Sequence, residues 1–282
     1  MTPPIRRRFV DTPVGPIHVA ACGAPDAPPV LLLHQTPRSW REYEAVLPRL
    51  GRTRHAIAMD TVGFGDSPPP PWPPSIERWA DAAHATLDAM GVGTVDLVGH
   101  HTGGVVAIEM AAARGDRVRS LVLSSTPWID AAGRERRRER PPVDAIEPDA
   151  DGGHLQQLWR QRRPFYPEGR PELLQAFVVD ALRAHGAPEV GHRVVAAYRM
   201  DERIGRVHQP ALVIRASADP FAAPQSQALR EHLHEARLVE IEGGGVPLPD
   251  QMPDAFAAAV EAFLAEVDAR RDAIAPRSEG RP

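Results

Sequence analysis

Apolar runs of strand length alternate with segments of helical spacing along most of this chain. The predicted core strands are short continuous apolar runs, as is typical of strands covered on both faces. They lie at 29–34, 55–60, 94–98, 118–124, 210–216 and 237–242. Helices are predicted at 39–50, 75–90, 104–114, 225–235 and 254–267, and a β-hairpin over 7–21 precedes the first core strand. The alternation predicts an α/β fold with a mainly parallel sheet and right-handed crossovers.

The strand at 94–98 passes into the following helix through a short turn, Gly99-His100-His101-Thr102-Gly103. Glycines on both sides let the strand and helix backbones approach closely, which pushes the residue at the apex of the turn outward. That residue is His101. The spacing resembles the nucleophile elbow of the α/β-hydrolase superfamily, in which the apex is normally a serine.

Three more motifs of this superfamily occur in the expected order. The first core strand ends in His34-Gln35-Thr36-Pro37, which is similar to the family's His-Gly-x-Pro loop. The turn motif Asp-x-x-Gly-x-Gly-x-Ser is matched at 60–67, and Asp219 follows a later strand, where the family carries its catalytic acid. The resemblance spans 7–268. It implies an α/β-hydrolase fold, with a mainly parallel sheet flanked by helices and an inserted helical cap.

The pattern changes between 128 and 206, the segment that we expect to form the cap. Short helical segments are predicted around 155–161, 171–185 and 188–200. Cap residues of the family line the upper wall of the pocket. A strongly charged run at 134–140 most simply forms a solvated surface, and a gate for an anionic substrate is the alternative.

The remaining boundaries follow from the position of the cap. We expect the core to comprise 1–127 and 207–268. Residues 269–282 are rich in Arg, Pro, Ser and Gly and are predicted to form a frayed, flexible tail.

The chain departs from the superfamily at two of its three catalytic positions. His101 stands where the nucleophile is expected, and Val246 follows Gly243-Gly244-Gly245 at the position of the catalytic histidine. Serine-type acyl transfer needs a hydroxyl and a base within hydrogen-bond distance of each other, and these positions provide neither. An ordinary serine esterase mechanism is therefore not expected.

We expect His101 to act as a general base in place of the missing imidazole. Its ring is long enough to approach Asp219, directly or through water, and the carboxylate would fix its tautomer and raise its basicity. Such an imidazole accepts a proton from water or from a substrate C–H or O–H, while the backbone N–H groups of Thr36 and Thr102 stabilise an oxyanion. The expected reaction is hydrolysis by activated water, elimination or isomerisation of a small, largely apolar organic substrate, without a cofactor.

Other residues near these motifs are candidates for contacting the substrate; they are His34, Gln35, His100, Ser125 and Trp128. His34 and His100 also have structural explanations, as a brace for the oxyanion loop and as packing beneath the elbow. No metal site is expected. Neighbouring histidines on a tight turn point apart, and His34, His100 and His101 take no part in a Glu-x-x-His or His-x-x-x-His spacing.

Two other functions stay open at this point. One is a pseudoenzyme that kept the pocket and binds a small ligand without catalysis. The other is a hydrolase whose nucleophile has moved elsewhere, for instance to Ser125.

Composition narrows the classes of function further. The chain contains no lysine, so Schiff-base chemistry and the phosphate-binding lysine of P-loop enzymes are excluded. A formal net charge of −4 argues against a nucleic-acid partner, and no apolar run approaches the ~18 residues of a membrane span. The single cysteine, Cys22, and a start without an apolar signal core favour a cytoplasmic protein, which we expect to be a monomer or a homodimer.

Overall fold

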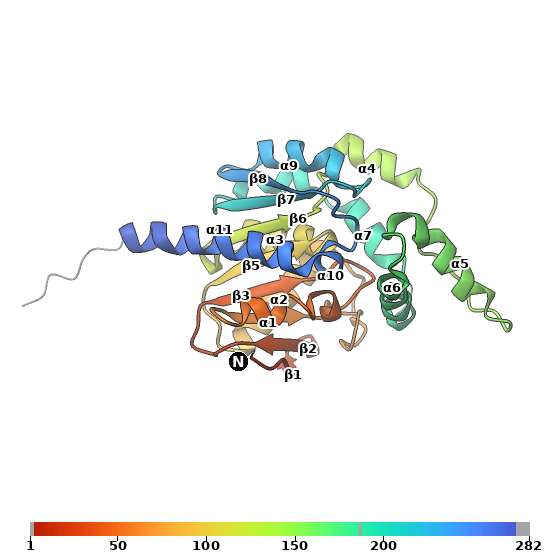
Figure 1. The fold of residues 1–282 in the computed structure, drawn as a ribbon, viewed down its shortest axis with the longest axis horizontal. Helices are drawn as coiled ribbons and strands as arrows, with labels where there is room; N and C mark the ends of the chain where they lie inside the picture. Colours follow the sequence, from red (N-terminus) through yellow and green to blue (C-terminus); the bar gives the residue numbers. More distant parts are fainter. Residues whose placement is uncertain (1–2, 186–187, 275–282) are drawn as a thin grey trace, which may run out of the picture.

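An eight-stranded sheet forms the centre of the computed structural model, which describes residues 3–185 and 188–274 (Figure 1). The strands are β1 (Arg6–Thr12), β2 (Gly15–Cys22), β3 (Pro29–Leu33), β4 (His55–Met59), β5 (Val95–His100), β6 (Val118–Ser124), β7 (Ala211–Ala216) and β8 (Ala236–Ile241). Their order across the sheet is β1-β2-β4-β3-β5-β6-β7-β8. Pairing is antiparallel from β1 to β2 and from β2 to β4, and parallel in every other pair. The predicted mainly parallel α/β architecture is confirmed.

Helices cover both faces of this sheet. Those on one face are α2 (Ile76–Ala89), α3 (Thr102–Ala113) and α9 (Ser226–His232). Those on the other are α1 (Leu47–Leu50), α10 (Leu248–Gln251) and α11 (Pro253–Ile274). The side chains of β3 alternate between the two layers, since Leu31 and Leu33 join the first core cluster while Val30 and Leu32 join the second. Successive strand residues point to opposite faces, so the apolar run that predicted this strand is buried on both sides.

The predicted helix at 39–50 is divided in the structure. It consists of a 3-10 turn, η1 (Trp40–Tyr43), followed by the short α1 with Pro48 in its first turn. Proline has no backbone N–H and is tolerated only in the first turn of a helix, so α1 begins anew at Leu47. Further 3-10 turns are η2 (Gly115–Arg117), η3 (Arg163–Phe165), η4 (Ile204–Arg206) and η5 (Ala223–Gln225).

The last helix, α11, is longer than predicted. It continues to Ile274, so residues 269–274 are helical and the prediction of a tail beginning at 269 is wrong for them. The added stretch contains Ala and Arg, which favour helix. The rest of the predicted tail, 275–282, lies outside the described residues. Within the described ranges, neither α11 nor any other helix combines the length and apolar character needed to cross a membrane.

The segment between β6 and β7 is a helical cap, drawn beyond one end of the sheet in Figure 1. Its helices are α4 (Ala131–Arg138), α5 (Gly153–Arg162), α6 (Pro171–Arg183), α7 (Val190–Ala197) and α8 (Met200–Arg203). α5 and α6 share a small core of their own that includes Leu158 and Phe177, whereas Val194 and Met200 pack on the main core. α4 coincides with the charged run, for which no helix was predicted.

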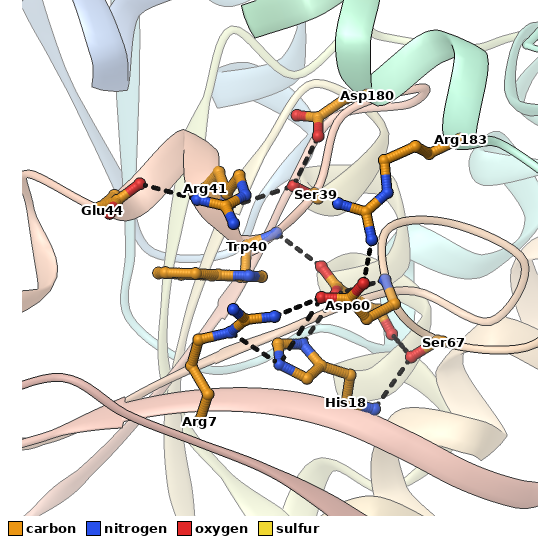
Figure 2. A network of polar contacts seen from close by, with 11 residues as sticks. Arg7, His18, Ser39, Trp40, Arg41, Glu44, Asp60, Ser67, Asp180 and Arg183 are labelled. Atoms are coloured by element: carbon orange, nitrogen blue, oxygen red, sulfur yellow. Dashed lines mark hydrogen bonds and ion pairs between the residues drawn. The ribbon is translucent and has the colours of Figure 1, made fainter.

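A buried guanidinium joins the cap to the core. Arg38 is 1% exposed and contacts Asp180 on α6 at 2.9 Å and Asp250 on α10 at 2.7 Å. A second link is the exposed ion pair between Arg183 on α6 and Asp66, part of the network in Figure 2. Asp180 and Arg183 are three positions apart and lie on the same face of α6, so both links hold that face against the core.

The turn motif at 60–67 is held by a network of polar contacts (Figure 2). The buried Asp60 carboxylate accepts the backbone N–H groups of Trp40 (2.7 Å) and Asp66 (2.9 Å) and contacts Nδ1 of His18 (2.8 Å). The Ser67 hydroxyl donates to the Asp60 carbonyl (2.8 Å). Burial opposes ionisation of Asp60, but the contact with His18 and the backbone N–H groups outweigh it and lower its pKa. The motif therefore shapes the fold here and makes no part of the cavity described below.

Candidate active site

His101 lies at the apex of the sharp turn between β5 and α3. Its backbone has φ 46° and ψ −113°, and its N–H donates to the carbonyl of Ser124 (2.9 Å). Close approach requires the flanking glycines, because a Cβ on Gly103 would lie 1.9 Å from the carbonyl oxygen of Leu33, and one on Gly99 would lie 2.4 Å from that of Gly103. Residues other than glycine rarely adopt a positive φ, so the packing around the turn must hold His101 in this conformation.

The ring of His101 contacts the carboxylate of Asp219, just after β7. Nε2 of His101 and Oδ2 of Asp219 are 2.9 Å apart. The ring N–H does not point straight at that oxygen, so the contact is close but lacks aligned hydrogen-bond geometry. The other carboxylate oxygen, Oδ1, accepts the backbone N–H groups of Phe221 (2.8 Å) and Ala222 (3.2 Å). The structure thus brings the two residues predicted to work together into direct contact.

Asp219 is suited to stabilise a positive charge on His101. Burial would favour the neutral acid, but the facing His101 and the two backbone N–H groups outweigh burial and hold the pKa of Asp219 below its usual range. The side chain of His101 is 16% exposed, whereas that of Asp219 is fully enclosed. Nδ1 of His101 makes no hydrogen bond within the described ranges and is the ring nitrogen left for a substrate.

Thr36 and Thr102 face each other beside this pair, with their hydroxyl oxygens 2.8 Å apart. Neither backbone N–H donates to another group of the described chain. Gln35 differs, because the buried carboxylate of Glu42 accepts both its backbone N–H (2.9 Å) and its side-chain amide (2.6 Å). The N–H groups of Thr36 and Thr102 are therefore the ones available to an oxyanion.

His100 is packed beneath the elbow and is wholly buried. Its Nε2 donates to the carbonyl of Val246 (2.8 Å), and its Nδ1 accepts the hydroxyl of Ser124 (3.0 Å). Burial, reinforced by the neighbouring His101, lowers the pKa of His100 to about 3, so the ring stays neutral. A substrate cannot reach the hydrogen bond between Ser124 and His100, because both side chains are enclosed.

His34 braces the loop that follows β3. Its Nδ1 donates to the carbonyl of Gln35 (2.7 Å), and its Nε2 accepts the backbone N–H of Thr61 (3.0 Å). Burial lowers the pKa of His34, which leaves the ring neutral and fixed between two backbone segments.

Ser125 and Trp128 are also outside the lining of the cavity that contains His101. Ser125 is 1% exposed, and its hydroxyl has no hydrogen-bond partner among the described residues. Trp128 stacks on His232 with 3.9 Å between the ring centroids. Of the five candidates for contacting the substrate, only Gln35 is among the described residues that line the cavity.

A cavity of about 730 Å³ opens at His101 between core and cap. The core contributes Gln35, Thr36, His101, Thr102, Phe221, Ala222 and Val246. Most cap side chains come from α4, from the segment 140–147 and from α7, and the cap also contributes Arg162 of α5, Glu189 and Arg199. This volume suits a small organic molecule. The charged run at 134–140 is the main sequence signal for the cap wall, and its pattern alone does not show which side chains face inward.

Two groups of side chains have the spacing of metal ligands. The first comprises His18, Asp60 and Asp66, and the second comprises Asp144, Glu189 and His192. In each group a guanidinium already contacts a carboxylate, from Arg183 on Asp66 and from Arg162 on Asp144. An arginine paired in this way competes with a metal ion for the same oxygen atoms, so neither arrangement favours metal binding.

Comparison with known proteins agrees with this architecture. The family described as alpha/beta hydrolase fold matches residues 28–197. A pimeloyl-[acyl-carrier protein] methyl ester esterase from Neisseria meningitidis is 28% identical over 83% of this chain and 93% of its own length. A 2-hydroxymuconate semialdehyde hydrolase from a Pseudomonas species is 35% identical, but the match covers only 36% of this chain and 37% of that protein.

A solved structure supports the same conclusion about the fold. The enol-lactonase from Burkholderia xenovorans superposes with a TM-score of 0.74 at 20% identity, over 92% of this chain and all of the other. At that identity the likeness concerns the fold alone. With the family matched over more than half of its length, this chain belongs to the α/β-hydrolase fold family.

Proposed function

We propose that this chain is an enzyme that acts on a small organic substrate by general base catalysis, with His101 as the base and Asp219 as its partner. Hydrolysis by activated water is the favoured reaction, because the relatives named above include an esterase and a hydrolase. Elimination and isomerisation use the same base and are the alternatives.

The observation that carries this proposal is the 2.9 Å contact between His101 Nε2 and Asp219 Oδ2 at the wall of the cavity. With its Nε2 proton directed to the carboxylate side, the neutral ring keeps a lone pair on Nδ1. That nitrogen can take a proton, and the carboxylate then stabilises the imidazolium.

Hydrolysis by this route uses one water molecule and one proton transfer in each direction. Nδ1 of His101 takes a proton from water while the water oxygen bonds to the electrophilic carbon of the substrate. The resulting oxyanion accepts the backbone N–H groups of Thr36 and Thr102. The oxyanion collapses, the leaving group departs, and the imidazolium returns its proton to that group. No side chain needs to form a covalent bond.

The test is turnover on a panel of small esters, thioesters and lactones by wild type and by two variants. We expect His101→Ala to lower kcat by ~10²–10⁴-fold, the range typical of a lost general base. Asp219→Asn should also lower kcat strongly, with little change in KM, because it acts through the histidine. His232→Gln, which removes a histidine away from the cavity, is the matched control and should retain activity.

Full turnover by His101→Ala would overturn the proposal. Labelling by a serine-directed phosphonate that disappears in Ser125→Ala would instead favour a relocated nucleophile. Saturable ligand binding without any product would favour a non-catalytic binding protein. The enclosed, unpartnered hydroxyl of Ser125 lends no support to the relocated nucleophile.

A further inference from the structure

Arginine dominates the charged side chains of the cavity that contains His101. Seven arginines line it, against two glutamates, Glu147 and Glu189. All seven belong to the cap, so the positive charge lies on the cap wall of the cavity, and His101 lies on the core wall. A cleft lined by one sign of charge concentrates ligands of the opposite sign.

Four of these arginines are already neutralised. The pairs are Arg134 with Asp201, Arg138 with Glu135, Arg162 with Asp144, and Arg199 with Glu202. The remaining three, Arg137, Arg140 and Arg193, have no carboxylate within ion-pair distance over residues 3–185 and 188–274. Against these three unpaired arginines stand two glutamates of the lining, Glu147 and Glu189, so the described lining keeps a small excess of positive charge.

Arg137 is the most informative of the three because it is partly buried, whereas Arg140 and Arg193 are exposed. Its guanidinium donates only to neutral acceptors, the Gln225 side-chain oxygen (3.2 Å) and the Gly133 carbonyl (3.3 Å). Burial, together with Arg140 and Arg136, lowers the pKa of Arg137. A partly desolvated cation without a counter-ion is unfavourable, and an anionic ligand would relieve that cost.

The position of Arg137 is fixed from the catalytic side. The side-chain oxygen of Gln225 accepts the hydrogen bond from Arg137. The side-chain nitrogen of the same residue donates to the carbonyl of Phe221 (2.6 Å), in the segment directly after Asp219. Phe221 in turn donates its backbone N–H to Asp219. The guanidinium is thus held at the cavity wall by the same loop that holds the catalytic acid.

We propose that the substrate carries a carboxylate group and that Arg137, assisted by Arg140 and Arg193, binds it at the cap wall of the cavity. This proposal rests on the function proposed above, since it concerns the substrate of the same site. A guanidinium presents two parallel N–H donors that match the two oxygens of a carboxylate. The apolar part of the substrate would then extend toward Val246 and the reacting group toward His101.

The test uses paired probes that differ in charge and little in shape, namely benzoate and benzamide, and glutarate and its diamide. Binding to the whole protein is measured by calorimetry at low and high salt. We expect the carboxylates to bind and the amides to bind at least about tenfold more weakly, with the difference reduced by salt. Equal affinity of acids and amides, or no carboxylate binding, would overturn the proposal.

The variants compare two neighbouring arginines of α4. R137Q should weaken carboxylate binding by about ten- to a hundredfold, and R137K should recover part of the loss because it keeps the charge without the two-pronged donor. R136Q removes the same charge from the same helix at a position off the cavity wall and should change affinity by no more than about twofold. Equal losses in R136Q and R137Q would mean that only the general charge of the helix matters.

The two proposals can fail separately. His101→Ala should keep its affinity for benzoate while losing turnover. If carboxylate binding depends on Arg137 but turnover does not depend on His101, the proposed substrate class stands and the proposed mechanism is wrong. If neutral compounds are turned over in a way that depends on His101 but not on Arg137, the proposed mechanism stands and the proposed substrate class is wrong.

Discussion

Two adjacent histidines occupy opposite environments at the elbow. His101 is partly exposed, contacts a charged carboxylate and faces the cavity, whereas His100 is enclosed and bonded to a backbone carbonyl and a serine hydroxyl. The residue type is the same, so the difference in expected chemistry comes wholly from burial and partners. His100 supports the loop at Val246, and His101 has the surroundings that the proposed base requires.

The buried state of His100 predicts a specific dependence of stability on pH. The pKa of this ring is about 3 in the folded protein and near 6.5 when unfolded. Between these values the unfolded chain binds one more proton than the folded chain, so the free energy of unfolding falls as the pH is lowered through this window. The slope from this one group is about 1.4 kcal/mol per pH unit.

Urea unfolding of wild type and His100→Gln at several pH values would measure that slope. Glutamine keeps a donor for the Val246 carbonyl but does not titrate. We expect the variant's stability to vary less steeply with pH across about pH 4 to 6, by the contribution of one proton. Identical slopes in the two proteins would contradict this account of His100.

At the scale of elements, the strand-turn-helix unit of β5 and α3 determines the position of His101. The backbone of α3 crosses close to the end of β3, and only a glycine fits at the crossing. The geometry of His101 is therefore a consequence of packing between secondary-structure elements, with no contribution required from its own side chain.

Gly103→Ala should be strongly destabilising for this reason. Its Cβ would lie 1.9 Å from the Leu33 carbonyl oxygen, and backbone atoms on both sides would have to shift. We expect a loss of ~1–3 kcal/mol or more in the free energy of unfolding. Gly93→Ala, where an added Cβ meets nothing within 4 Å, should change it by less than about 0.5 kcal/mol. Chemical denaturation of both variants tests the comparison.

Elements with a strong local pattern were predictable from the sequence. β6 occupies 118–124 as predicted, and the predicted α2 begins after the capping Ser75, whose hydroxyl accepts the N–H of Arg78. Two elements differ from the prediction for local reasons. Pro48 divides the helix predicted at 39–50, and α4 was missed because its charges give no apolar stripe for packing.

The same division applies to the site. The spacing of the elbow and of the acid was enough to predict that His101 meets Asp219, since both positions are set by the fold. Which cap arginines face inward was not predictable, because a run of charges looks alike whether it meets solvent or a cavity. His34, His100, Ser125 and Trp128 do not reach the cavity wall, because each is packed against core or surface neighbours instead.

At the scale of the whole molecule, Arg38 is a buried link between cap and core. Glu42 lies 3.9 Å away in the same loop, in addition to the contacts with Asp180 and Asp250. Arg38→Met would leave Asp180 and Asp250 without their cation. We expect it to lower the free energy of unfolding by ~3–5 kcal/mol.

The exposed ion pair between Arg183 and Asp66 provides a comparison with the buried contacts of Arg38. The Arg183 side chain is 42% exposed, so Arg183→Gln should cost less than about 1 kcal/mol although it also removes a contact between cap and core. Thermal and urea unfolding of both variants would show the contrast. Equal effects would mean that burial of Arg38 is not what gives its contacts their importance.

Arg38 also lies two positions after Thr36, and its partner Asp250 lies four positions after Val246. One guanidinium consequently connects three parts of the chain: the loop of Thr36, the segment that follows Val246, and α6 of the cap. These contacts join two segments of the cavity lining, at Thr36 and Val246, to a helix of the cap without any ligand. The protein should accordingly choose its substrates by their fit to a space already made, with little closing of the cap around them.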